Sequence, residues 1–107
     1  RCFTYVDDCV ETIRKFVASD ITGPLNIGSD LEISMRDLCE TIMRIAGKKL
    51  EIKNVPGPIG PLSRNSDNTY IREALGFAPD STRERLEACL KVTYNWIAAN
   101  VEAAKKA

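Results

Sequence analysis

Histidine is absent from this sequence, and none of its cysteines forms a C-x-x-C pair. A zinc site would have to use cysteine and carboxylate ligands alone, so we expect no metal site. Most of the cysteines fall on apolar helical faces, which is typical of reduced core thiols and favours a cytoplasmic origin. The cysteines are Cys2, Cys9, Cys39 and Cys89.

The chain also has no charge excess and no long apolar run. Fifteen basic residues balance fifteen acidic residues, whereas a nucleic-acid-binding module normally shows a basic excess or stripe. No apolar stretch approaches the ~20 residues that span a membrane, and no signal peptide is visible. We therefore expect a protein that binds neither nucleic acid nor membranes.

An initiator methionine is lacking as well, because the chain begins at Arg1, directly before the strand-like CFTYV. Natural domains seldom start inside an element, which favours a fragment of a longer protein. The length of 107 residues corresponds to one domain. We therefore treat residues 1–107 as a single unit.

Hydrophobic periodicity predicts three short strands, at residues 3–6, 25–27 and 50–55. Capping residues and apolar stripes at helical spacing predict four helices. These are expected after Asp7 or Asp8, between Ser34 and Gly47, over residues 67–75, and from the capping pair Ser81 and Glu84 to Val101. The order β-α-β-α-β-loop-α-α predicts an α/β fold with a small, mostly parallel sheet.

The stretch PGPIGPLSRNSDNTYI, residues 56–71, lies between the last predicted strand and the third helix. Its first half mimics the spacing of a G-x-x-G-x-x-G dinucleotide loop. The mimicry fails because Pro58 and Pro61 lack the N–H donors that a pyrophosphate needs, and Ser63 replaces the third glycine. This loop is therefore not predicted to bind NAD.

Arg64 stands just upstream of the predicted helix start in the same stretch. A helix N-terminus offers free N–H groups, and an arginine beside it adds a bidentate clamp, which together suit a phosphate or diphosphate. Asp67 would repel such an anion unless it points into the helix cap. The plain alternative is a solvated loop arginine, and the residues alone leave both interpretations open.

Five motifs carry a family resemblance across almost the whole chain: RCFTYVDDCVETI, PLNIGSD, PGPIGPLSRNSDN, IREALGFAP and TYNWI. In this order and spacing they resemble the C-terminal segment of the GDP-mannose 3,5-epimerase family of extended short-chain dehydrogenases/reductases. The resemblance implies a substrate-binding lobe of an NAD-dependent nucleotide-sugar epimerase, an isomerase. It implies a GDP-mannose-like nucleotide sugar as the substrate.

The resemblance also implies the site residues. Arg64 matches the family arginine that contacts the diphosphate, and Arg1 matches one that lies near the nucleotide. Asn65, Ser66 and Asn68 match the same motif and are further substrate-binding candidates. The chain departs from the family at Leu62 and Ser63, where an arginine and a glycine are usual, so a UDP- or dTDP-sugar epimerase or dehydratase stays open.

The family's Tyr-x-x-x-Lys pair has no counterpart here, because Tyr5, Tyr70 and Tyr94 are followed four places on by Cys9, Ala74 and Ala98. The glycine-rich NAD loop and its Rossmann domain have no counterpart either. The resemblance thus implies no catalytic residue and no cofactor for this chain alone, with NAD and the Rossmann domain supplied by the intact parent protein.

A free-standing binding or interaction module without catalysis is the alternative. A lobe detached from a Rossmann domain should expose an apolar patch larger than the ~300–600 Å² of typical monomers. We expect such a patch here, and self-association into a homo-oligomer through it.

Overall fold

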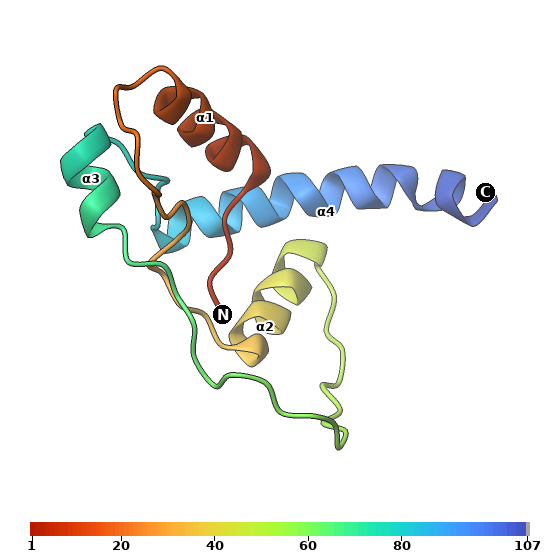
Figure 1. Cartoon of the computed structure of the whole chain (residues 1–107). Helices are drawn as coiled ribbons and strands as arrows, with labels where there is room; N and C mark the ends of the chain where they lie inside the picture. The colour runs from red at the N-terminus through yellow and green to blue at the C-terminus, as the bar shows by residue number, and fades with distance from the viewer. Residues whose placement is uncertain (107) are drawn as a thin grey trace.

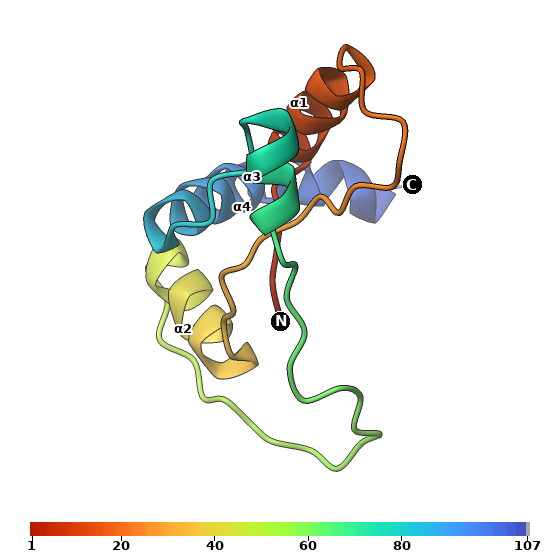
Figure 2. The same ribbon diagram turned by 60° about the vertical axis from the view of Figure 1, so that its left-hand side comes forward.

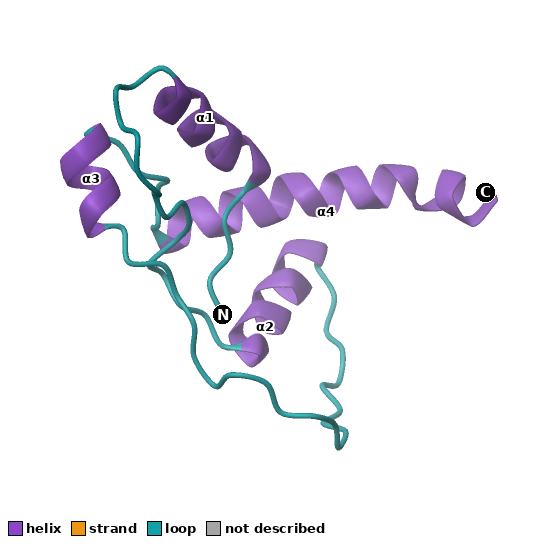
Figure 3. Ribbon diagram, in the orientation of Figure 1, coloured by secondary structure: helices purple, strands orange, loops and turns teal. Residues whose placement is uncertain are grey.

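The chain forms four α-helices joined by extended loops in the computed structural model, which describes residues 1–106 (Figure 1). Residue 107 of the predicted single unit lies outside the described residues. The helices are α1 (Val6–Val17), α2 (Met35–Ala46), α3 (Thr69–Leu75) and α4 (Arg83–Lys106). No strand occurs among residues 1–106 (Figure 3), so the predicted α/β fold with a parallel sheet is wrong.

The predicted strands fail because they find no ladder of neighbours. The backbone nitrogen of Arg1 donates a hydrogen bond to the Ile33 carbonyl at 3.0 Å, and the Arg1 carbonyl accepts one from the Ile33 N–H at 2.9 Å. This is one antiparallel-type pair, whereas a strand needs repeated pairs. Residues 25–27 and 50–55 have no strand partner within the described chain, and the segment 3–6 ends in the first residue of α1. Alternation of side chains indicates an extended backbone but not whether a neighbour exists.

The limits of α2 and the end of α3 follow the sequence prediction. The Ser34 hydroxyl accepts a hydrogen bond from the Asp37 N–H at 3.0 Å, which is a helix N-cap. Gly47 and Gly76 follow α2 and α3 with φ of 64° each, the left-handed conformation that glycine adopts without strain. These signals are local, so they can be read from the sequence.

The capping residues predicted for α1 and α4 are wrong. Residues 7–8 do not cap α1: its N-cap is Tyr5, and the Asp8 carboxylate accepts instead from the Arg85 guanidinium of α4. Near the start of α4 the Thr82 hydroxyl, and not that of Ser81, accepts from the Arg85 N–H at 3.2 Å. At α1 a tertiary ion pair engages the predicted capping residue Asp8. At α4 the neighbouring Thr82 hydroxyl caps the helix in place of Ser81.

Helix α2 packs against the first half of α4, and the second half of α4 projects away from the other helices (Figures 1 and 2). The Arg83 guanidinium donates to the buried Thr41 hydroxyl at 2.9 Å, and Arg44 pairs with Glu87 at 3.0 Å. The buried apolar residues are few: Ile33, Leu38, Ile71 and Cys89. The radius of gyration is 16.8 Å, whereas a compact chain of this length has ~13 Å.

Candidate functional site

Three extended segments, residues 1–5, 28–33 and 61–68, meet beside α3, and we call their meeting point the junction. The pair between Arg1 and Ile33 joins the first two segments. The Ser66 N–H donates to the Ser29 carbonyl at 3.1 Å and joins the third. The site residues predicted from the sequence all lie in the first and third segments, so the fold does bring them into one region.

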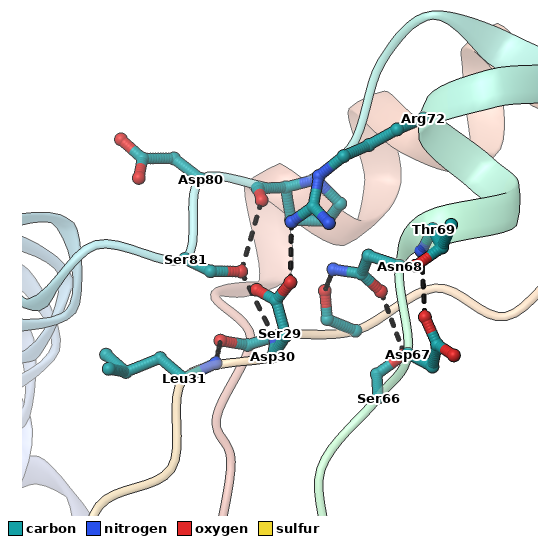
Figure 4. A network of polar contacts seen from close by, with 12 residues as sticks. Ser29, Asp30, Leu31, Ser66, Asp67, Asn68, Thr69, Arg72, Asp80 and Ser81 are labelled. Carbon is teal, nitrogen blue, oxygen red and sulfur yellow. Dashed lines mark hydrogen bonds and ion pairs between the residues drawn. The ribbon is translucent and has the colours of Figure 1, made fainter.

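Ser66 and Asn68 are part of the internal framework of the junction (Figure 4). The Asn68 amide, 1% exposed, donates to the Gly28 carbonyl at 2.9 Å and accepts from the Ser66 hydroxyl at 2.9 Å. A β-carbon placed on Gly28 would lie 2.7 Å from the Ser66 β-carbon, so the two segments touch where only glycine fits. The Ser66 and Asn68 side chains therefore have partners inside the protein.

Arg64 and Asn65 are exposed and make no side-chain hydrogen bond or ion pair with the described residues 1–106. Immediately before them, the Ser63 hydroxyl donates to a Glu32 carboxylate oxygen at 2.6 Å. Immediately after them, Ser66 is held on the 28–33 segment. The loop is thus attached on both sides of two polar side chains that face solvent.

Arg1 is anchored by both its backbone and its side chain. Its backbone pairs with Ile33, and its guanidinium donates to the Pro61 carbonyl, with Nη2 close against Gly60. The loop before Arg64 therefore carries a second cation on its surface. Arg1 and Arg64 are brought to the same loop, although no contact joins their side chains.

Helix α3 starts two residues later than predicted, at Thr69 instead of Asp67. The Asp67 carboxylate accepts from the Thr69 N–H at 3.0 Å, and this hydrogen bond lowers the pKa of Asp67. The anion of Asp67 is therefore directed to the start of α3. Arg64 lies well before a helix of seven residues, so its chemistry rests on the loop and not on a helix N-terminus.

A salt bridge fixes α3 to the junction (Figure 4). Arg72 donates to the Asp30 carboxylate at 2.6 Å, and the Asp30 N–H donates to the Ser81 hydroxyl at 3.3 Å. Hydrogen bonding from Arg72, and then Ser81, lowers the pKa of Asp30. The residues around Arg64 thus rest on a segment that is itself attached to α3 and to the start of α4.

A cavity of about 120 Å³ lies between the N-terminal segment and α4. It is mostly apolar and has the Asp8–Arg85 ion pair and the Cys89 thiol on its wall. Burial raises the pKa of Cys89, so the thiol stays protonated at neutral pH. No residue of the 61–68 segment lines this cavity, whereas the other two junction segments contribute to its wall, for example with Tyr5 and Leu31.

Residues 1–106 contain no group of three or more histidine, cysteine, aspartate or glutamate residues placed to hold a metal ion. Over the same residues, every helix is too short or too polar to cross a membrane.

Sequence reasoning missed the residues that hold the loop, which are Gly28, Ser29, Glu32 and Ser63. A signal was present for the first of these, because an isolated glycine after a strand-like run often marks a close backbone approach. Neither partner of the Ser63–Glu32 contact stands out in the sequence. Their contact joins residues 31 positions apart.

Comparison with known proteins gives no matching family model. The chain is 44% identical over 98% of its length to GDP-mannose 3,5-epimerase of Arabidopsis thaliana, and 43% identical to GDP-mannose 3,5-epimerase 1 of Oryza sativa subsp. indica. It is 39% identical over 74% of its length to UDP-glucuronic acid decarboxylase 5 of Arabidopsis thaliana, 24% of whose length it covers. The chain spans about 27% of the length of the two epimerases. The resemblance indicated by the motifs is thereby confirmed: the chain is homologous to a C-terminal segment of the GDP-mannose 3,5-epimerases.

Proposed function

We propose that this chain is the substrate-binding portion of an NAD-dependent nucleotide-sugar epimerase and that Arg64 binds the diphosphate of the nucleotide sugar. The observation that carries the proposal is an exposed Arg64 guanidinium, without a partner among residues 1–106, on a loop attached on both sides. A guanidinium suits phosphate oxygens because its planar donors match them two at a time. Binding need not break an existing ion pair first.

Arg1 and Asn65 have supporting roles in this proposal. The Arg1 guanidinium contacts the Gly60–Pro61 part of the same loop, so a second positive charge favours the same anion. Asn65 offers an exposed amide next to Arg64 for a further hydrogen bond. For Ser66 and Asn68, which are also ligand candidates from the resemblance, we propose a supporting role in the loop, because their side chains bond to each other and to Gly28.

The described residues do not fit NAD. Pro58 and Pro61 remove backbone donors from the glycine-containing loop, and α3, the next helix, has seven residues and starts beyond Asn68. We therefore propose that NAD and the acid and base groups belong to the rest of the longer parent protein, and that this chain alone is inactive. The names of the relatives, which concern GDP- and UDP-sugars, support the substrate class.

The UDP-sugar alternative keeps the same diphosphate role for Arg64. It is supported by the 39% identity to UDP-glucuronic acid decarboxylase 5. Because phosphate contacts do not distinguish bases, the choice between guanine and uracil depends on other residues. A comparison of GDP and UDP affinities for the same chain separates the two readings.

An exposed apolar stripe on α1 supports the view that a further domain packs on this chain. Val6, Val10, Ile13 and Val17 recur at helical spacing and are 45–75% exposed. We propose that the NAD-binding domain of the parent protein covers this stripe. The free-standing module remains the alternative, and it predicts that the chain stays monomeric with the stripe in water.

The direct test is Arg64→Ala, with GDP affinity measured by NMR titration, which tolerates weak binding. Removing a charge-assisted bidentate contact should weaken GDP binding by about 10–100-fold. Arg36→Ala is the matched control, because Arg36 is an exposed arginine of α2 without a side-chain partner in the described chain. Unchanged affinity in Arg64→Ala, or an equal loss in Arg36→Ala, would remove Arg64 from the site.

A further inference from the structure

We infer that Glu32 is a positioning residue for Arg64 and acts through Ser63; the inference rests on the proposed diphosphate role of Arg64. The Ser63 hydroxyl donates to Glu32 Oε1 at 2.6 Å, one residue before Arg64. On the other side, the Ser66 N–H donates to the Ser29 carbonyl at 3.1 Å. Both acceptors belong to the 28–33 segment, so this one segment holds the loop at two points.

The two attachments leave only Arg64 and Asn65 between them. In contrast, the loop upstream is long and exposed: it leaves α2 at Gly47 and swings away from the helices in both views (Figures 1 and 2). The Lys48 N–H donates to the Met43 carbonyl at the end of α2. Between Lys48 and Ser63, the loop's hydrogen bond to the rest of the described chain is the one from Arg1 to the Pro61 carbonyl. Without the Ser63–Glu32 contact, the Arg1–Pro61 hydrogen bond alone would hold the loop on the N-terminal side of Arg64.

Holding a binding residue in place before the ligand arrives increases affinity, because less conformational freedom is lost on binding. The 28–33 segment can do this because it is itself fixed. Ile33 is 3% exposed and pairs with Arg1, and Asp30 is held by Arg72. Glu32 lies between these two fixed residues and presents its carboxylate to Ser63.

The charge of Glu32 separates positioning from plain electrostatics. A carboxylate near an anion site repels the anion. If Glu32 acted through its charge alone, any neutral substitution of Glu32 would make the chain bind GDP more tightly. If Glu32 positions the loop, the two neutral substitutions should differ in their GDP affinity. Glu32→Gln keeps an oxygen that accepts from Ser63 and removes the repulsion, whereas Glu32→Ala removes the acceptor.

The experiment measures GDP affinity by NMR titration in variants of the full chain. Ser63→Ala and Glu32→Ala should each bind about three- to ten-fold more weakly, as expected when one hydrogen bond that orders a binding residue is lost. Ser63→Thr keeps the hydroxyl and Glu32→Gln keeps an acceptor oxygen. Both variants should bind GDP no more than about two-fold more weakly than the original chain. Tighter binding by Glu32→Ala than by the original chain would overturn the inference in favour of simple repulsion.

A double substitution tests whether Ser63 acts through Arg64. If it does, Ser63→Ala should cause no further loss when Arg64 is already alanine, because coupled residues are not additive. A general structural role would give the same loss in both backgrounds and would overturn the inference.

The loop itself provides a readout that needs no ligand. In the original chain and in Ser63→Thr, the Asn65 amide should have an order parameter near the ~0.85 of a rigid backbone; in Ser63→Ala it should fall toward ~0.6. Equal values in all three chains would overturn the positioning role even if Arg64→Ala abolishes GDP binding. If instead Arg64→Ala leaves GDP affinity unchanged while the Asn65 amide responds as expected, the proposed function fails and the positioning of the loop stands.

Discussion

Among single residues, Gly28 determines how closely the 28–33 segment approaches the loop that carries Arg64. Its α-carbon faces the Ser66 side chain, and its carbonyl accepts from Asn68. Both contacts come from residues that the RNSDN motif marked as ligand candidates. The motif therefore combines residues of two kinds, with Arg64 and Asn65 exposed and Ser66 and Asn68 engaged within the junction.

We predict that Gly28→Ala destabilises the chain by about 1–3 kcal/mol, the usual cost of inserting a methyl group into a closely packed site. The new β-carbon would lie 2.7 Å from that of Ser66, so one segment must shift. Gly57→Ala is the matched control, because nothing lies within 4 Å of its added β-carbon. Urea unfolding of both variants gives the comparison, and equal stability of the two would refute the close approach.

The role proposed for Arg64 comes from the sequence, whereas the contacts that support its loop could not be predicted from it. An arginine among small polar residues after a proline- and glycine-rich run is visible in one stretch of the chain. The Glu32–Ser63 and Gly28–Ser66 contacts join residues that are 31 and 38 positions apart, and neither pair follows from spacing. The resemblance points to the charged residue, and only the structure reveals the residues that hold its loop.

At the scale of elements, helices and strands differ in how much of their evidence is local. The end of α2 at Gly47 and its start at Ser34 depend on residues within one turn, and both predictions are confirmed. The three predicted strands depended on partners elsewhere, and all three are wrong over the described residues. The one antiparallel-type pair, between Arg1 and Ile33, lies outside the strand predicted over residues 3–6 and does not make a sheet.

The link between α3 and the junction should depend on pH. Arg72, and then Ser81, lower the pKa of Asp30 in the folded chain below its ordinary value of 3.8, so the unfolded chain takes up this proton at a higher pH. The stabilisation is therefore present above about pH 4 and lost as the pH falls through the folded-state pKa. We predict that Asp30→Asn lowers the free energy of unfolding at pH 7 and makes its decline below pH 4 shallower.

Urea unfolding at pH 7, 4 and 3 provides the measurement. Asp20→Asn is the control, because Asp20 is exposed and its side chain has no hydrogen bond or ion pair with residues 1–106. A decline in Asp30→Asn as steep as that of the original chain would show that the Arg72 contact does not stabilise the fold.

At the scale of the whole molecule, the chain is open. Its radius of gyration of 16.8 Å reflects a long α4 that extends beyond its partners and a loop that swings away from the four helices (Figure 2). Many large apolar side chains are exposed, including Trp96 at 67% on α4 and Val17 at 75% on α1. The predicted size of a contiguous apolar patch stays a prediction, since separate side chains do not give its area.

We predict concentration-dependent self-association through the α1 stripe, because burying apolar surface is favourable at about 25 cal/mol per Å². Val10→Lys should reduce it, measured by sedimentation equilibrium, since Val10 is 57% exposed in the middle of the stripe. Leu62→Lys is the control, because Leu62 is 92% exposed on the distant loop. A chain that stays monomeric, or an equal response of both variants, would exclude α1 as the contact.

The junction also has a consequence for the order of folding. Its contacts close segments of 32 to 60 residues between Arg1, Ile33 and Pro61, whereas the hydrogen bonds within each helix close only a few. Contacts between residues far apart in the sequence cost more chain entropy before they contribute any stabilisation, so they form slowly. The helices should therefore appear first, and the loop that presents Arg64 should acquire its shape only in the last cooperative step. A substitution that slows this step would delay competence to bind while leaving the helical content of the chain almost unchanged.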